Sequence, residues 1–163
     1  MNNKFHPLSV SFLNRICICL SAFAILTGGI IYILFRASEP LFFRWLNVAG
    51  FEQWLAVIRQ NSLTHAPFLS EWIIYSLPNG LWAFAYALVI TSIWSGSKSW
   101  IRILWMVSIP ILVLGYELFQ YAGILSGTYC FQDMVLSLLG LVIGIMIGLK
   151  MYKANNDEKI PEE

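Results

Sequence analysis

The chain has 163 residues, of which 58% are hydrophobic and only 12% are charged, and its formal net charge is +1. Soluble domains usually carry about 25% charged residues, so this composition excludes an ordinary soluble domain and indicates a single membrane domain. The near-neutral charge gives no electrostatic basis for binding nucleic acid. Cys17, Cys19 and Cys130 do not form a disulfide framework and are interpreted as packing residues.

The first apolar stretch, 16–35, contains no charged residue and is flanked by Arg15 and Arg36. Its length matches one transmembrane helix. It is longer than the core of a typical signal peptide, and no small-x-small cleavage site follows it. We therefore expect a first span that is retained.

The segment 37–71 is predicted to be an extracytoplasmic loop that lies in the membrane interface. Within it, 41–48 is expected to form a short helix that ends at Gly50, and 51–60 an amphipathic helix. The apolar face of the amphipathic helix would hold Phe51, Trp54, Leu55 and Ile58, and the polar face Glu52, Gln53, Arg59 and Gln60. The alternative is a small extramembrane cap that packs on itself.

The second expected span, 72–94, has tryptophans at both ends, as is typical of membrane interfaces. Pro78-Asn79-Gly80 is predicted to interrupt its first third. Backbone groups freed in a membrane need partners from protein or water, so this interruption is expected to face protein.

Two further spans are expected at 103–125, with Pro110 as a kink, and at 131–149. In the last of them Gly140, Gly144 and Gly148 recur every four residues, a ridge that lets another helix approach closely. The charged tail 153–163 is predicted to be disordered. The predicted fold class is thus all-α: a polytopic membrane protein with four transmembrane helices and an amphipathic interfacial segment between the first and the second.

The distribution of basic residues predicts the orientation of the chain in the membrane. With four spans, seven of the ten Lys and Arg residues fall on the side of the two termini. The positive-inside rule then places both termini in the cytoplasm and the multi-pass protein in the cell inner (cytoplasmic) membrane.

Four polar residues lie within the spans at a similar expected depth: Asn79, Glu117, Gln120 and Asp133. In this orientation Asn79 lies ~10 Å and Glu117 ~12 Å from the outer ends of their helices, at 1.5 Å per residue. An ionised carboxylate at the centre of a membrane helix costs at least ~2.5 kcal/mol, so unpaired ones are rarely kept. These residues are interpreted as an outward-facing polar site, with a structural tie between helices as the alternative.

No metal or cofactor is predicted. The chain has no HExxH motif and no phosphate-binding glycine loop, and His6 and His65 both lie outside the expected spans.

The pattern Glu117-Leu-Phe-Gln120, then Gly127-Thr-Tyr-Cys-Phe-Gln-Asp133, then Gly140 and Gly144 resembles the VanZ-like family of small bacterial membrane proteins. The resemblance covers about 72–149. The family often has arginine at the position of Thr128, aspartate at that of Cys130 and asparagine at that of Ser137.

Two main hypotheses for the function follow. In the first, Asn79, Glu117, Gln120 and Asp133 bind a membrane lipid of the cell envelope or its head group. In the second, the protein is a membrane enzyme acting on a lipid-linked substrate, with Glu117 or Asp133 as acid or base. A small transporter is disfavoured because the inner halves of the spans offer almost no polar path. No oligomeric state is predicted.

Overall fold

The computed structural model describes residues 12–35, 48–65, 68–124 and 129–157, and every regular element in these ranges is a helix. The helices are α1 (Phe12–Phe35), α3 (Glu52–His65), α4 (Glu71–Tyr75), α5 (Leu77–Trp94), α6 (Ile101–Tyr121) and α7 (Phe131–Asp157). Among them α1, α5, α6 and α7 are long and apolar enough to cross a membrane. The prediction of an all-α, multi-pass membrane protein is confirmed.

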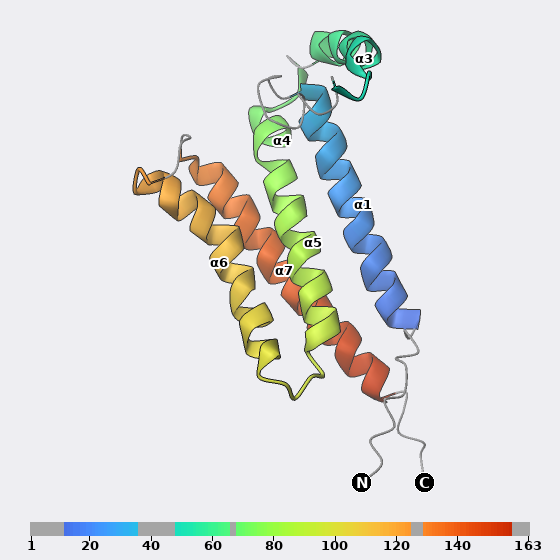
Figure 1. Cartoon of the computed structure of the whole chain (residues 1–163), viewed down its shortest axis with the longest axis vertical. Helices are drawn as coiled ribbons and strands as arrows, with labels where there is room; N and C mark the ends of the chain where they lie inside the picture. The colour runs from blue at the N-terminus through green and yellow to red at the C-terminus, as the bar shows by residue number, and fades with distance from the viewer. Residues whose placement is uncertain (1–11, 36–47, 66–67, 125–128, 158–163) are drawn as a thin grey trace.

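The four long helices alternate in direction between two ends of the bundle (Figure 1). One end, which we call the α3 end, carries α3, α4, the end of α6 and the start of α7. Helices α5 and α7 both run away from the α3 end and pack closely side by side, while α1 packs on another face of α5. Helix α5 is therefore the central helix of the bundle.

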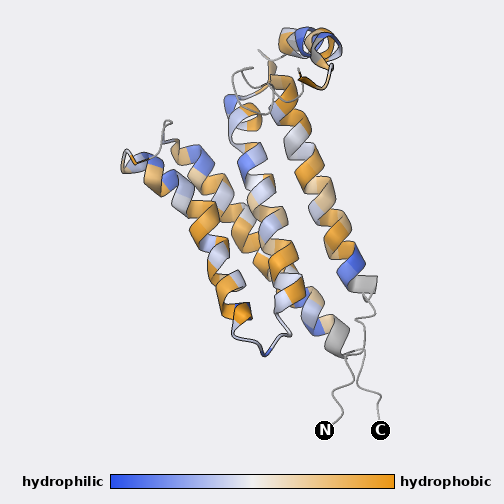
Figure 2. Cartoon of the chain, in the orientation of Figure 1, coloured by the Kyte–Doolittle hydropathy of each residue, from blue (hydrophilic) through white to orange (hydrophobic). Residues whose placement is uncertain are grey.

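Much of the apolar surface of the bundle is exposed. Large side chains such as Phe23 on α1, and Ile103 and Leu112 on α6, are mostly accessible. Figure 2 shows apolar turns along most of α1 and α6, with hydrophilic turns near the start of α1 and toward the end of α6. A soluble monomer rarely exposes apolar patches of this extent, and a lipid bilayer accounts for them.

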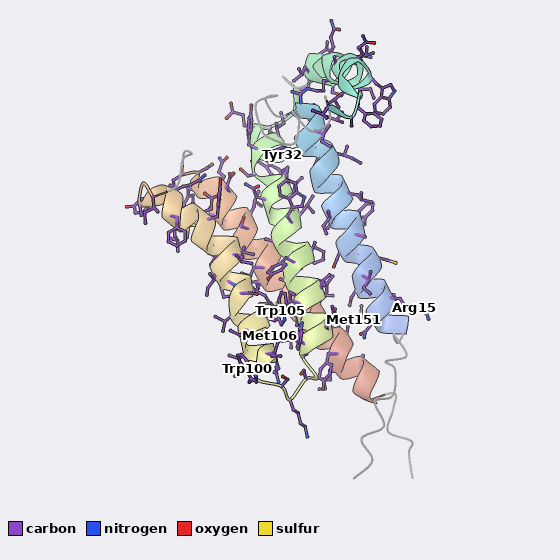
Figure 3. All side chains as sticks on the ribbon, viewed as in Figure 1. Arg15, Tyr32, Trp100, Trp105, Met106 and Met151 are labelled. Carbon is purple, nitrogen blue, oxygen red and sulfur yellow. The ribbon has the colours of Figure 1, made fainter. Side chains whose placement is uncertain are left out.

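The core between α5, α6 and α7 is small. Ala87, Ile90, Ile109 and Leu141 form a buried apolar cluster that joins the three helices. Toward the end opposite α3, the rings of Trp94 and Trp105 stack with their centroids 6.1 Å apart, and Trp105 and Met106 lie on α6 in Figure 3. This cluster fixes the helices against one another at mid-bundle.

The predicted glycine ridge of α7 does receive another helix closely, and that helix is α5. A Cβ atom added at Gly140 would collide with the carbonyl oxygen of Gly80, and one at Gly144 would lie 2.6 Å from the carbonyl oxygen of Phe84. Gly148 faces the side chain of Thr91 in the same way. The ridge therefore packs α7 against α5 within one chain.

The break in the second span lies earlier than the sequence suggested. It falls at Ser76, between α4 and α5, and not at Pro78-Asn79-Gly80, which belongs to the first turn of α5. Proline lacks an N–H, so Pro78 cannot donate to the carbonyl of Ile74. The missing donor is tolerated in the first turn of a helix, and this explains why α5 starts just before the proline.

Three other boundaries differ from the expected ones. Helix α6 ends at Tyr121, because Gly123 adopts a φ of 71° and the amide of Ile124 donates to the carbonyl of Phe119, which closes the helix. Helix α7 continues to Asp157, so the tail is helical beyond Lys153 and only 158–163 lies outside the described residues. Helix α3 is longer than the expected 51–60, and the short helix expected at 41–48 falls almost wholly outside the described residues.

Candidate functional site

Asn79 and Asp133 are brought together although 54 residues separate them. Asn79 lies in the first turn of α5 and Asp133 in the first turn of α7. The Nδ2 atom of Asn79 donates a hydrogen bond of 3.0 Å to Oδ2 of Asp133. The position of Asp133 also suits its charge, because the start of a helix carries a partial positive charge. These two of the four predicted site residues are in direct contact.

Glu117 is buried on α6, with a side chain that is 6% exposed. The position of Glu117 along the bundle axis can be measured from the core cluster. Ile109 of that cluster precedes Glu117 by eight residues, and Ala87 and Leu141 lie eight residues beyond Asn79 and Asp133 on helices that run the opposite way. Each of the three polar residues is thus ~12 Å from the core cluster, toward the α3 end.

Gln120 lies one turn closer to the α3 end than Glu117 and is half-buried. Its backbone carbonyl accepts from the amide of Gly123 and helps to end α6. The side chain of Gln120 makes no hydrogen bond to any residue that the structure describes. Gln120 therefore lies nearer the α3 end than Asn79, Glu117 and Asp133 and forms no hydrogen bond with them.

Sequence reasoning missed Ser76, which is 0% exposed at the junction of α4 and α5. The sequence carried a signal for it: Ser76 precedes Asn79 by three residues and so shares its helix face, and it stands two residues before a proline. It is a small polar residue at a point where the helix must break.

Ser76 and Asp133 lie at the same level on neighbouring helices. Gly80 packs against the backbone of Leu136, and α5 and α7 run in the same direction. One helical turn back from this contact lie Ser76 on one helix and Asp133 on the other. We call Ser76, Asn79, Glu117 and Asp133 the polar site.

Buried atoms of the polar site without a hydrogen-bond partner within the described residues include Oγ of Ser76 and Oδ1 of Asp133, whose side chain is 9% exposed. Buried polar groups are nearly always hydrogen-bonded, and each exception needs an explanation such as a ligand or water. The described chain forms no ion pair with Asp133 either. Two atoms on facing helices thus have unused capacity for a ligand.

The donor set consists of oxygen atoms. Among the described residues, no three His, Cys, Asp or Glu side chains come together in a way that could hold a metal ion. The site can accept hydrogen bonds at the carboxylates and both accept and donate at the serine hydroxyl. These atoms can form hydrogen bonds with a polar group.

The described fold defines a small multi-pass membrane protein. No family model, no curated protein and no solved structure matches the chain.

Proposed function

We propose that the protein binds the head group of a membrane lipid at the polar site, with Gln120 at its rim. The hydrogen bond between Asn79 and Asp133 carries this proposal, because it joins two helices at a buried carboxylate that keeps one oxygen atom unused. We further propose that the protein is VanZ-like and lies in the cytoplasmic membrane of a bacterium, with the site toward the outer surface. The order of Glu117, Gln120 and Asp133 before the glycine ridge supports this resemblance.

The energetic argument favours a ligand over a purely structural role. Polar contacts between membrane helices contribute on average only ~0.6 kcal/mol. Placing an ionised carboxylate at the centre of a membrane helix costs ~2.5 kcal/mol or more. Glu117 and Asp133 lie nearer the ends of their helices, where this cost is smaller, but both side chains are buried, and a contact between helices offsets only part of the cost of burying two acidic residues.

Native mass spectrometry of the gently purified protein tests the proposal. We expect the parent protein to retain a lipid reproducibly. Glu117→Gln keeps the shape of the side chain and removes its ionisation, so it should fold normally and retain that lipid about tenfold less. Gln132→Ala is the matched control, because Gln132 is adjacent to Asp133 in sequence but exposed.

Two results would count against this function. Equal retention in the parent and in Glu117→Gln, with harm only in Glu117→Leu, would make Glu117 a structural tie. A retained lipid that has been chemically altered would instead favour the enzyme hypothesis, with Glu117 or Asp133 as acid or base.

A further inference from the structure

The polar site has more hydrogen-bond acceptors than donors. One N–H of the Asn79 amide is donated to Asp133, which leaves its second N–H as a donor and its carbonyl oxygen as an acceptor. Oδ1 of Asp133 is buried with no partner in the described chain. A ligand that fits these atoms must therefore supply N–H or O–H donors.

The charge of the site leads to the same requirement. Five of the six described Lys and Arg residues lie toward the end of the bundle opposite α3: Arg15, Lys98, Arg102, Lys150 and Lys153. The sixth, Arg59 on α3, donates a hydrogen bond of 2.9 Å to the carbonyl of Ile33 at the end of α1. An ionised Asp133 thus has no cation within the described chain to balance it.

From these two observations we propose that the polar site binds a primary ammonium group, and that the head-group amine of an aminophospholipid is its source. The inference rests on the proposed function and names the chemical class of its ligand. An R–NH₃⁺ group carries three N–H donors and one positive charge, which match Oδ1 of Asp133, Oγ of Ser76 and the amide oxygen of Asn79. A quaternary ammonium has the charge but no donors, and a phosphate would be repelled by the carboxylates.

The surroundings favour a lipid over a free amine. Beside Glu117 on α6 the side chains of Tyr116, Leu118 and Phe119 are exposed. In a membrane these side chains face acyl chains, so a lipid whose amine enters the site can keep its tails in the hydrocarbon. A soluble amine would gain nothing from this surface.

The test compares lipids that differ only in the head group. Delipidated full-length protein in detergent is mixed with phosphatidylethanolamine, phosphatidylcholine or phosphatidylglycerol of identical acyl chains, and binding is measured by native mass spectrometry. We expect phosphatidylethanolamine to be retained about tenfold more than the other two. Asp133→Asn keeps the shape and one acceptor but removes the charge, and should reduce this preference to less than twofold.

Ser76→Ala is a milder variant that removes one hydroxyl from a fully buried position, and Gln132→Ala is again the control. Circular dichroism and thermal melting establish that each variant folds. If Asp133→Asn unfolds, a weaker preference for phosphatidylethanolamine in a folded Ser76→Ala still supports the inference, and an unchanged preference overturns it.

Further arms separate the possible ligands. Ethanolamine that raises the melting temperature without retention of phosphatidylethanolamine would overturn the lipid source. A rise in melting temperature with sodium chloride but not with choline chloride, absent in Asp133→Asn, would show that the site binds a metal cation and not an ammonium group. Retention of phosphatidylglycerol that depends on Asp133 would leave the proposed function intact and refute this inference. If the retention of every lipid is the same in the parent protein and in the Asp133→Asn and Ser76→Ala variants, the proposed function and this inference are both wrong.

Discussion

Single residues decide how closely the helices of this bundle approach. Gly140 on α7 and Gly80 on α5 put the two backbones in direct contact, a distance that excludes any side chain between them. Such close approach matters in a membrane, where no hydrophobic driving force holds helices together and van der Waals packing contributes more. The same contact sets the register that places Asn79 opposite Asp133.

We expect Gly140→Ala to destabilise the bundle by about 1–3 kcal/mol, because the added methyl group would collide with the backbone of α5. Gly29→Ala on α1 is the matched control, since its added methyl group would meet nothing within 4 Å. It should change the stability by less than about 1 kcal/mol. Unfolding in a mixed-micelle denaturant titration measures both. An equal response of the two variants would contradict the assigned packing of α5 on α7.

At the scale of elements, α3 shows how an amphipathic segment is attached to a membrane bundle. Leu55 is buried, and the guanidinium of Arg59 reaches the carbonyl of Ile33 at the end of α1. Arg59, predicted on the polar face of this segment, is half-buried, and its guanidinium supplies a partner to a carbonyl in the last turn of α1 that has none within its own helix. Tyr32, labelled in Figure 3 at this end of α1, stacks at a tilt on Trp82 of α5 with ring centroids 5.5 Å apart. Together these contacts link α3 to α1, and α1 to α5.

Trp54 on α3 is 66% exposed on the protein surface, which suits an indole that lies in the membrane interface. We expect a spin label at position 54 to be accessible to oxygen and one at position 53 to be accessible to water, because the two side chains point about 100° apart. Power-saturation measurements in liposomes test this. Equal exposure of both labels to water would favour the alternative, a cap that stands clear of the membrane.

At the scale of the whole molecule, the arrangement of the helices sets the distribution of charge. The start of α1, the connection from α5 to α6 and the end of α7 lie together at the end opposite α3. Basic residues gather there, including Lys98 and Lys150, while the polar site lies toward the α3 end. The positive-inside rule therefore predicts that the α3 end faces away from the cytoplasm.

Reporter fusions test this orientation. Fusions at Lys98 and after Glu163 should report the cytoplasm, and one after Gln60 the outside, because short loops rich in Lys and Arg stay on the cytoplasmic side. Each fusion is paired with a reporter of the opposite specificity as its control. An external signal after Glu163 would refute the orientation and would place the polar site in the other leaflet.

The sequence by itself determined the four spans and the ridge of Gly140, Gly144 and Gly148. Both are local properties: hydropathy is summed along the chain, and a helix in lipid satisfies its backbone within its own segment. The spans also placed Asn79, Glu117 and Asp133 at a similar depth, because depth along a helix follows from counting residues.

Only the tertiary structure decided which helix the ridge meets, that Ser76 is buried at the level of Asp133, and that Asn79 donates to this carboxylate. It also showed that Gln120 forms no hydrogen bond with Asn79 or Asp133, and that Arg59 points toward α1. These features depend on how each helix is rotated about its axis and shifted against its neighbours. No periodicity along a single helix fixes that rotation, since it results from the packing of side chains far apart in the sequence.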